Sequence, residues 1–283
     1  LHYHLKTGGV TTVIRQQVEA VKEDCETLVF AGSPPESDFP AQVISVDGLG
    51  YDSESDRPCR PEITAGHLLE ALYRQWPEGC DLLHVHNPIL AKNRNLLKIL
   101  HHLQKAGLRL LCQVHDFAED GRPQAYFKEP YPDDSHWAVI NSRDFRLLRK
   151  AGLKPEGLHW IPNTVGPLPA GKDSGVEGKR ILYPVRAIRR KNIGEAILLS
   201  LFFAPPAALS ITRPPNSAAD MDSYRDWKVF VRQHGLSVEF EAGLCRDFEK
   251  LVSESRFLLT TSITATAQMK RKTRRKNPAR PGS

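Results

Sequence analysis

Four cationic side chains lie within six residues of one another in the segment 183–193, which reads YPVRAIRRKNI. They are Arg186, Arg189, Arg190 and Lys191. An apolar, strand-like run precedes them, and a helical pattern follows from Asn192. Because a helix N-terminus already carries partial positive charge, four cations there are unfavourable unless an anion shares the site. Helix N-termini bind phosphate readily, so the pattern indicates a phosphate or diphosphate site. A solvated basic turn is the alternative.

Two adjacent glycines, Gly8 and Gly9, lie between the first strand-like segment and the first helical pattern. Glycine lets a ligand approach the backbone closely, and the helix behind it directs its N–H groups at the same point. In an open parallel sheet this is the carboxyl edge, where ligands bind. A tight turn between strand and helix, without a ligand, is the alternative.

Histidines end two further strand-like segments, DLLHVHN at 81–87 and QVHD at 113–116. His84 and His86 share one face of their strand. No third ligand accompanies them at a helpful spacing, so a metal site is disfavoured. We expect one of the two to be buried and hydrogen-bonded and the other to line a cleft. His115 and Asp116 lie where catalytic loops occur in α/β folds, although each could equally be a structural loop residue.

Two more strand ends carry polar tips, INS at 140–142 and IPNTV at 161–165. Ser142 is expected to cap the helix that follows the first of them. Alone, both segments indicate turns.

Short apolar strands alternate with amphipathic helices along most of the chain, which predicts an α/β fold with mainly parallel sheets. A stretch rich in glycine and proline interrupts the pattern at 167–178. We therefore expect an N-terminal Rossmann-like domain at 1–166, a linker at 167–178 and a second α/β domain at 179–263. Residues 264–283 lack apolar periodicity and are predicted to form a disordered basic tail.

Charge and cysteine content exclude several classes of protein. The net charge is +6, but residues 264–283 hold seven lysines and arginines and no acid, so the rest of the chain sums to −1. The body of the protein therefore gives no reason to expect specific nucleic-acid binding. Five widely spaced cysteines without a C-x-x-C pair fit buried thiols in a reducing cytosol. No apolar run approaches the roughly 18 residues of a membrane helix. The first residue is Leu1, so we expect that the natural start is missing.

Taken together and in this order, the segments resemble the retaining nucleotide-sugar glycosyltransferases of the GT-B type, a large family that includes sucrose synthases and bacterial polysaccharide glycosyltransferases. The resemblance covers about residues 1–263, and LTTSIT at 259–264 matches the strand before the family's donor loop. It implies two Rossmann-like domains that face a cleft, with a nucleotide-diphosphate sugar bound between them.

The resemblance also implies roles for individual residues. Arg186 and Lys191 match the family's donor-phosphate pair and would stabilise the leaving group, with His115 and Asp116 as the other catalytic candidates. Gly8, Gly9 and Asn163 would contact the donor. The acceptor-side candidates are His86, Asn87 and Asn141. Neither metal nor cofactor is expected, because cationic side chains would stabilise the leaving diphosphate.

The sequence departs from the family after TTSIT. The family continues with an acidic residue, a glycine-rich turn and a second carboxylate, whereas residues 265–270 read ATAQMK. The change predicts an incomplete second domain, from a truncated gene or a shifted reading frame, and impaired sugar transfer.

The leading hypothesis is thus a cytoplasmic, metal-independent hexosyltransferase that acts on a nucleotide sugar and an unknown sugar or small-molecule acceptor. Peripheral association with a membrane is compatible with the sequence. The rival hypothesis is a non-enzymatic protein whose basic tail binds nucleic acid or an acidic surface. The base and sugar of the donor, the acceptor and the oligomeric state are not encoded in any pattern found here.

Overall fold

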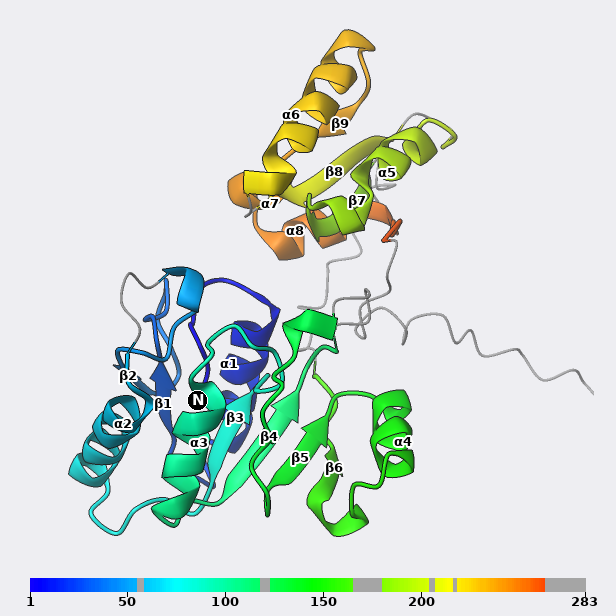
Figure 1. The fold of residues 1–283 in the computed structure, drawn as a ribbon. Coiled ribbons are helices and arrows are strands. Elements are labelled where there is room, and N and C mark those ends of the chain that lie inside the picture. Colours follow the sequence, from blue (N-terminus) through cyan, green and yellow to red (C-terminus); the bar gives the residue numbers. More distant parts are fainter. Residues whose placement is uncertain (55–58, 118–122, 165–179, 204–206, 216–217, 263–283) are drawn as a thin grey trace, which may run out of the picture. The chain divides into compact units, whose positions relative to one another are not determined.

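The computed structural model describes residues 1–54, 59–117, 123–164, 180–203, 207–215 and 218–262. The chain divides into two compact units between Gly166 and Pro167, here called unit 1 and unit 2. Each unit has helices packed on parallel strands (Figure 1). The mixed α/β fold with parallel sheets predicted from the sequence is therefore confirmed. The predicted basic tail, residues 264–283, lies outside the described residues.

Unit 1 contains two groups of parallel strands. Strands β3 (Leu83–His86), β4 (Leu110–Val114), β5 (His136–Val139) and β6 (Leu158–Trp160) form one sheet in that order. Strands β1 (Leu28–Ala31) and β2 (Gln42–Ser45) form a second pair.

The N-terminal segment connects these two groups. His2 N donates to Phe30 O at 3.0 Å on one side, and His86 N donates to Leu1 O at 2.9 Å on the other. The strands thus follow the order β2, β1, residues 1–5, β3, β4, β5, β6. This is the order of the Rossmann fold, whose ligands bind where the strand order reverses, at the carboxyl ends.

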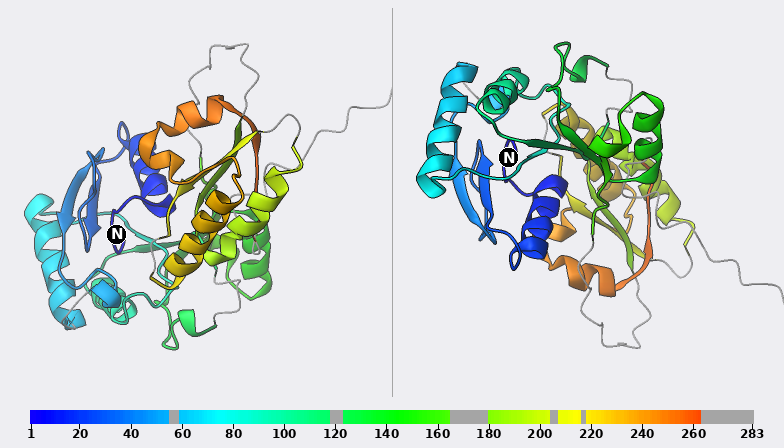
Figure 2. Two further views of the ribbon diagram at one scale, coloured as in Figure 1. Left: turned by 90° about the horizontal axis from the view of Figure 1, so that it is seen from above. Right: turned by 90° about the horizontal axis from the view of Figure 1, so that it is seen from below.

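Four helices cover the strands of unit 1. They are α1 (Gly9–Val21), α2 (Pro61–Gln75), α3 (Leu96–Lys105) and α4 (Ser142–Lys150). Short 3₁₀ turns occur at η1 (Asp52–Glu54), η2 (Pro123–Ala125) and η3 (Pro155–Gly157). Figure 2 shows α1 on the opposite side of the strands from α2 and α3, as right-handed crossovers require when the strand order reverses.

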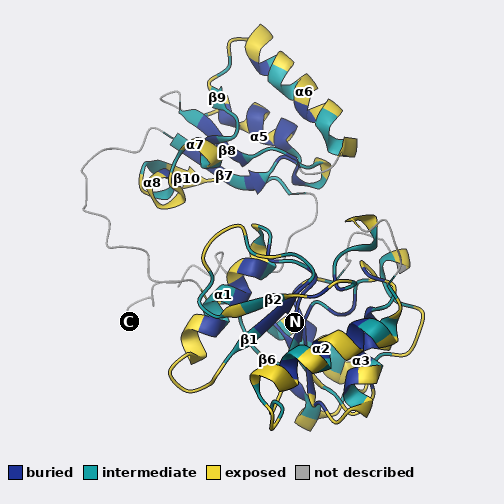
Figure 3. Ribbon diagram, turned by 90° about the vertical axis from the view of Figure 1, so that its left-hand side faces the viewer, coloured by how far each residue is buried: buried dark blue, intermediate teal, exposed yellow. Residues whose placement is uncertain are grey.

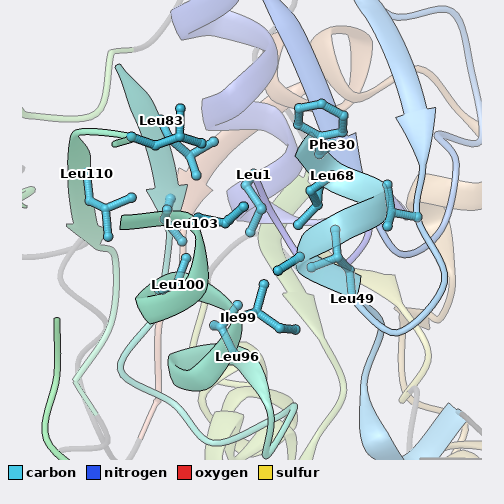
Figure 4. Packing of buried hydrophobic residues seen from close by; sticks show 14 of the residues in the cluster. Leu1, Phe30, Leu49, Leu68, Leu83, Leu96, Ile99, Leu100, Leu103 and Leu110 are labelled. Carbon is cyan, nitrogen blue, oxygen red and sulfur yellow. The ribbon is translucent and has the colours of Figure 1, made fainter. Parts of the chain in front are cut away.

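Leucine-rich helix faces build the core of unit 1. In α3, Leu96, Leu97, Ile99, Leu100 and Leu103 are all at most 1% exposed. Figure 4 shows four of them, Leu96, Ile99, Leu100 and Leu103, in one cluster with Leu68 of α2 and with Leu83 and Leu110 of the sheet. Since a fully buried leucine or isoleucine contributes roughly 1.5–3 kcal/mol, this cluster fixes where the strand ends lie.

Unit 2 has one parallel sheet in the order β10, β7, β8, β9. Its strands are β7 (Arg180–Arg186), β8 (Ala208–Arg213), β9 (Val238–Glu239) and β10 (Ser255–Leu258). Its helices are α5 (Ile193–Ser200), α6 (Ala218–Gln233), α7 (Ala242–Cys245) and α8 (Phe248–Ser253), and Arg189–Lys191 form the 3₁₀ turn η4. Figure 3 shows the inner strands largely buried and the outer face of α6 exposed.

Two local expectations were wrong. Asn141, not Ser142, caps α4, because the Asn141 side chain accepts from Asp144 N at 2.9 Å. The thiols are not all buried: Cys112 is, but Cys25, which follows α1, and Cys245, the last residue of α7, are exposed. None of the helices among the described residues has the length and apolar character that a bilayer-spanning helix needs.

Gly194 allows α5 and α6 to approach closely. A Cβ atom at this position would lie 2.1 Å from the ring of Trp227 in α6, so the indole would have to move. Gly66 in α2 is also a helical glycine, but an added Cβ at this position would have no atom within 4 Å.

We expect Gly194→Ala to lower the free energy of unfolding by about 1–3 kcal/mol, because overpacking costs more than the gain in helix propensity. Gly66→Ala is the matched control and should raise it by up to about 1 kcal/mol. Urea denaturation of both variants measures the difference. Equal effects would show that the Trp227 contact does not constrain the packing.

Candidate functional site

The four predicted cations of unit 2 lie at the carboxyl end of β7 and just after it. Arg186 is the last residue of the strand, and Arg189, Arg190 and Lys191 form η4. Asn192 then adopts a left-handed conformation, with φ of 51°, and α5 begins at Ile193. The helix thus starts one residue later than predicted, because η4 and Asn192 reverse the chain first. Lys191 is only 9% exposed, which is unusual for a lysine.

A fully buried tyrosine holds this turn in place. Tyr183 of β7 is 0% exposed, and its hydroxyl donates to the carbonyl oxygen of Lys191. Thr261, which follows β10, donates from its hydroxyl to Lys191 O at 3.2 Å and to Asn192 O at 2.8 Å. Side chains from two strands therefore fix the backbone that carries the cations.

A fifth cation, Arg213, ends β8 beside Arg186, which lies directly opposite it in the strand register. Arg213 is not among the residues predicted from the sequence. The signal was present, because Arg213 follows the apolar run of β8 just as Arg186 follows that of β7. Carboxylates border the cluster: Asp220 accepts from Arg189 N at 2.9 Å, and Glu195 accepts from the Asn192 side chain at 2.6 Å.

Buried imidazoles gather at the carboxyl ends of β3 and β4 in unit 1. His86 Nδ1 lies 2.9 Å from His115 Nε2, and the two rings stack with centroids 5.2 Å apart. The ring of His84 stacks on His86 at 4.1 Å. On the other side, His2 Nδ1 lies 3.1 Å from His86 O. His86 is therefore buried and hydrogen-bonded, as expected for one of the two strand histidines.

Burial keeps these imidazoles neutral. It lowers the pKa of His115 to about 4 and the pKa values of His2 and His84 to about 3. It also places the pKa of His86 well below its usual value. In a bond between two neutral imidazoles one nitrogen donates and the other accepts, so the tautomers of His86 and His115 are coupled. His115 Nδ1 is buried and has no hydrogen-bond partner in the structure.

The neighbouring asparagine fixes the backbone of His115. Asn87 has a positive φ of 59°, and its side-chain oxygen accepts from His115 N at 3.1 Å. Asn87 N donates to Gln113 O at 2.7 Å. Asp116 is exposed beside His115. His86, Asn87, His115 and Asp116 are thus brought together, whereas Asn141 and Asn163 follow β5 and β6 farther along the sheet.

Asn141 and Asn163 differ in their surroundings. Both ends of the Asn141 amide are used within the cap of α4, where its nitrogen also donates to the Asp144 carboxylate. Asn163 Oδ1 is buried and has no hydrogen-bond partner in the structure. Their acceptor-side and donor-side roles remain predictions.

Gly8 and Gly9 lie where α1 begins. Gly8 precedes the helix with φ of −179°, which any residue adopts, and no side chain caps the helix. An added Cβ at Gly8 would meet nothing nearer than Lys6 O at 3.7 Å. Neither the conformation nor the surroundings of Gly8 require a glycine, so contact of a ligand with this turn remains a prediction.

Among the described residues, no three His, Cys, Asp or Glu side chains are placed to hold a metal ion. The two groups therefore differ in chemistry. Unit 2 presents positive charge suited to phosphate, and unit 1 presents neutral imidazole and amide groups suited to hydroxyls.

Known proteins resemble the chain in sequence and in fold. No family model matches it. The sequence is 25% identical over 270 residues to mannosylglucosyl-3-phosphoglycerate synthase of Petrotoga mobilis, covering 82% of this chain. The chain spans about half of that relative, 52% of its length. The resemblance is thus to a glycosyltransferase, an enzyme class, as the sequence motifs predicted.

A similarity to solved structures covers more of the chain than the similarity in sequence does. Anabaena HepE, determined in complex with UDP and glucose, superimposes with a TM-score of 0.61 over 93% of this chain and 74% of its own, at 12% identity. HepE in complex with UDP alone gives the same values. At this identity the likeness concerns the fold, and it supports the mixed α/β architecture.

We predict that acid weakens the fold through the imidazoles. His115 and His84 bind protons in the unfolded chain below pH about 6.5 but in the folded chain only near pH 4 and 3, so stability should fall as pH drops from 6.5 towards 4. Between pH 6.5 and pH 5, each of these buried histidines should lower the free energy of unfolding by about 1–2 kcal/mol.

Urea denaturation at pH 7 and pH 5 measures this loss. The His115→Gln variant should show a smaller pH-dependent change than the unsubstituted protein. A pH dependence that His115→Gln leaves unchanged would contradict burial of a neutral imidazole at this position.

Proposed function

We propose that the protein is a nucleotide-sugar glycosyltransferase in which unit 2 binds the diphosphate of the donor and unit 1 binds sugar hydroxyls. The observation that carries the proposal is the group of cations at the carboxyl end of the parallel sheet in unit 2, held by Tyr183 and Thr261. Ligands of open α/β sheets bind at that edge, and arginine and lysine bind phosphate through charge-assisted hydrogen bonds.

The chemistry follows from what must be stabilised. Sugar transfer releases a nucleoside diphosphate, and negative charge develops on its phosphate oxygens as the glycosidic bond breaks. Arg186 and Lys191 would stabilise that charge without a metal ion. Because η4 fixes its backbone before the ligand arrives, little reorganisation would oppose binding. Transfer with retention, and binding between two facing domains, are carried over from the family resemblance.

Unit 1 would orient the sugars. Neutral His115 can donate or accept one hydrogen bond with a hydroxyl through Nδ1, which has no partner among the described residues. Asn87 holds the backbone of His115 in place. Gly8 and Gly9 would admit the diphosphate or the acceptor to the N-terminus of α1. Asp116, His86, Asn141 and Asn163 remain candidates at the strand ends of the same sheet.

Impaired turnover is part of the proposal. Residues 263–283 contain no acid, although the family places two carboxylates after the strand that ends at TTSIT. Without partners for the sugar and ribose hydroxyls, binding would lose several kcal/mol, since unpaired polar groups are costly. The rival hypothesis of a binding tail concerns the same residues, and no structural observation favours it.

Arg186→Ala should weaken UDP binding at least about tenfold, because one charge-assisted contact to phosphate contributes roughly 1.5–3 kcal/mol. Isothermal titration calorimetry with UDP measures the affinity. Arg232→Ala, an exposed arginine at the end of α6, is the matched control for the loss of one positive charge. Equal affinities for the two variants would remove Arg186 from the site.

Transfer from UDP- and GDP-sugars should be slow or undetectable. The assay follows release of nucleoside diphosphate with a panel of acceptors that includes glucose and glucosyl-3-phosphoglycerate, which is contained in the product named for the Petrotoga relative. Multiple rapid turnovers would refute the impairment and leave the assignment to sugar transfer intact.

A further inference from the structure

The strand pair β7–β8 contains an irregularity just before the cations. Tyr183 lies opposite Ile211, and Arg186 lies opposite Arg213, so β7 uses one residue more than β8 over this interval. Pro184 falls within the interval. Proline has no N–H to donate to a neighbouring strand, and in a central strand such as β7 it is found at bulges. Bulges are frequent beside active sites, where they redirect a side chain.

The extra residue has a consequence for charge. In an uninterrupted register Val185 would lie opposite Arg213. The irregularity instead places Arg186 there, and Ala187 N donates to Arg213 O at 2.9 Å to fix the pairing. Because neighbouring strands are about 4.8 Å apart, the side chains of Arg186 and Arg213 leave the backbone next to each other. Like charges placed directly opposite each other are destabilising.

The other end of β7 shows how the protein neutralises an arginine when the role is structural. Arg180 Nη1 lies 2.5 Å from Glu239 and its Nε lies 3.5 Å from Glu254, and Arg246 completes the network. Arg213 forms no ion pair with any residue that the structure describes. Arg213 is half-buried at the strand end, opposite a second arginine in the strand register.

We propose that Arg213 is a further phosphate-binding residue, and that Arg186 and Arg213 together hold the diphosphate of the donor. This inference rests on the proposed function and extends it to a residue on a second strand. Each guanidinium presents a planar set of donors that matches two phosphate oxygens. A diphosphate provides enough oxygens to occupy both, and it removes the repulsion that the register creates.

Calorimetric titration of the full chain with UDP and with UMP tests the proposal. Arg213→Gln should weaken UDP binding about ten- to a hundredfold, and UMP binding less, because UMP has one phosphate for the pair. Arg186→Gln should behave in the same way, and the exposed Arg232→Gln should bind both ligands like the unsubstituted protein.

The outcomes separate the two proposals. If Arg186→Gln weakens UDP binding and Arg213→Gln does not, Arg213 lies outside the site and the proposed function stands. If neither variant loses UDP, both proposals fail. If only Arg213→Gln loses UDP, the pairing with Arg186 is wrong.

A stability measurement distinguishes binding from a structural role. Arg213→Gln should leave the melting temperature of the ligand-free protein unchanged or raise it, since it removes a like-charge neighbour, and it should diminish the rise that UDP causes. A ligand-free protein that melts earlier, with the UDP-induced rise intact, would make Arg213 a structural residue and overturn the inference.

Discussion

Cations at the carboxyl ends of β7 and β8 determine the chemistry of unit 2, because Arg186 and Arg213 lie opposite each other in the strand register and Arg189, Arg190 and Lys191 follow in η4. The backbone that carries them is held by hydrogen bonds of about 1 kcal/mol each, from Tyr183 and Thr261 to the carbonyls of Lys191 and Asn192. The burial of Tyr183 and the close packing of α5 on α6 at Gly194 keep these donors in place. An anion at this edge would offset the like charge of these cations.

Unit 1 follows the opposite principle. Its carboxyl edge gathers histidines that burial keeps uncharged, and their rings hydrogen-bond and stack with one another. Neutral imidazole exchanges hydrogen bonds with hydroxyl groups without attracting a competing anion. The charge of unit 2 suits a phosphate and the neutral imidazoles of unit 1 suit hydroxyl groups. The leucine-rich face of α3 makes this arrangement rigid, because it fixes the strands whose ends carry His86 and His115.

Periodicity and strand-end residues predicted much of this from the sequence. The alternation of apolar strands with amphipathic helices gave the α/β class, and the cations after β7 were visible as a run. The sequence could not show that Asn141 caps α4, because Ser142 and Asn141 are both good caps and only the backbone conformation decides between them. It could not show Arg213 opposite Arg186, since strand register depends on a bulge at Pro184. Nor could it show that His86 and His115, 29 residues apart, share a hydrogen bond.

The central claim is that the cations of unit 2 hold a diphosphate. Comparison of UDP with uridine in equilibrium binding, at low and at high salt, tests it most directly, because the two ligands differ only in the phosphates. The account predicts measurable UDP binding that weakens as salt screens the charges, and no measurable uridine binding. Uridine that binds as tightly as UDP, or UDP affinity that is indifferent to salt, would contradict it.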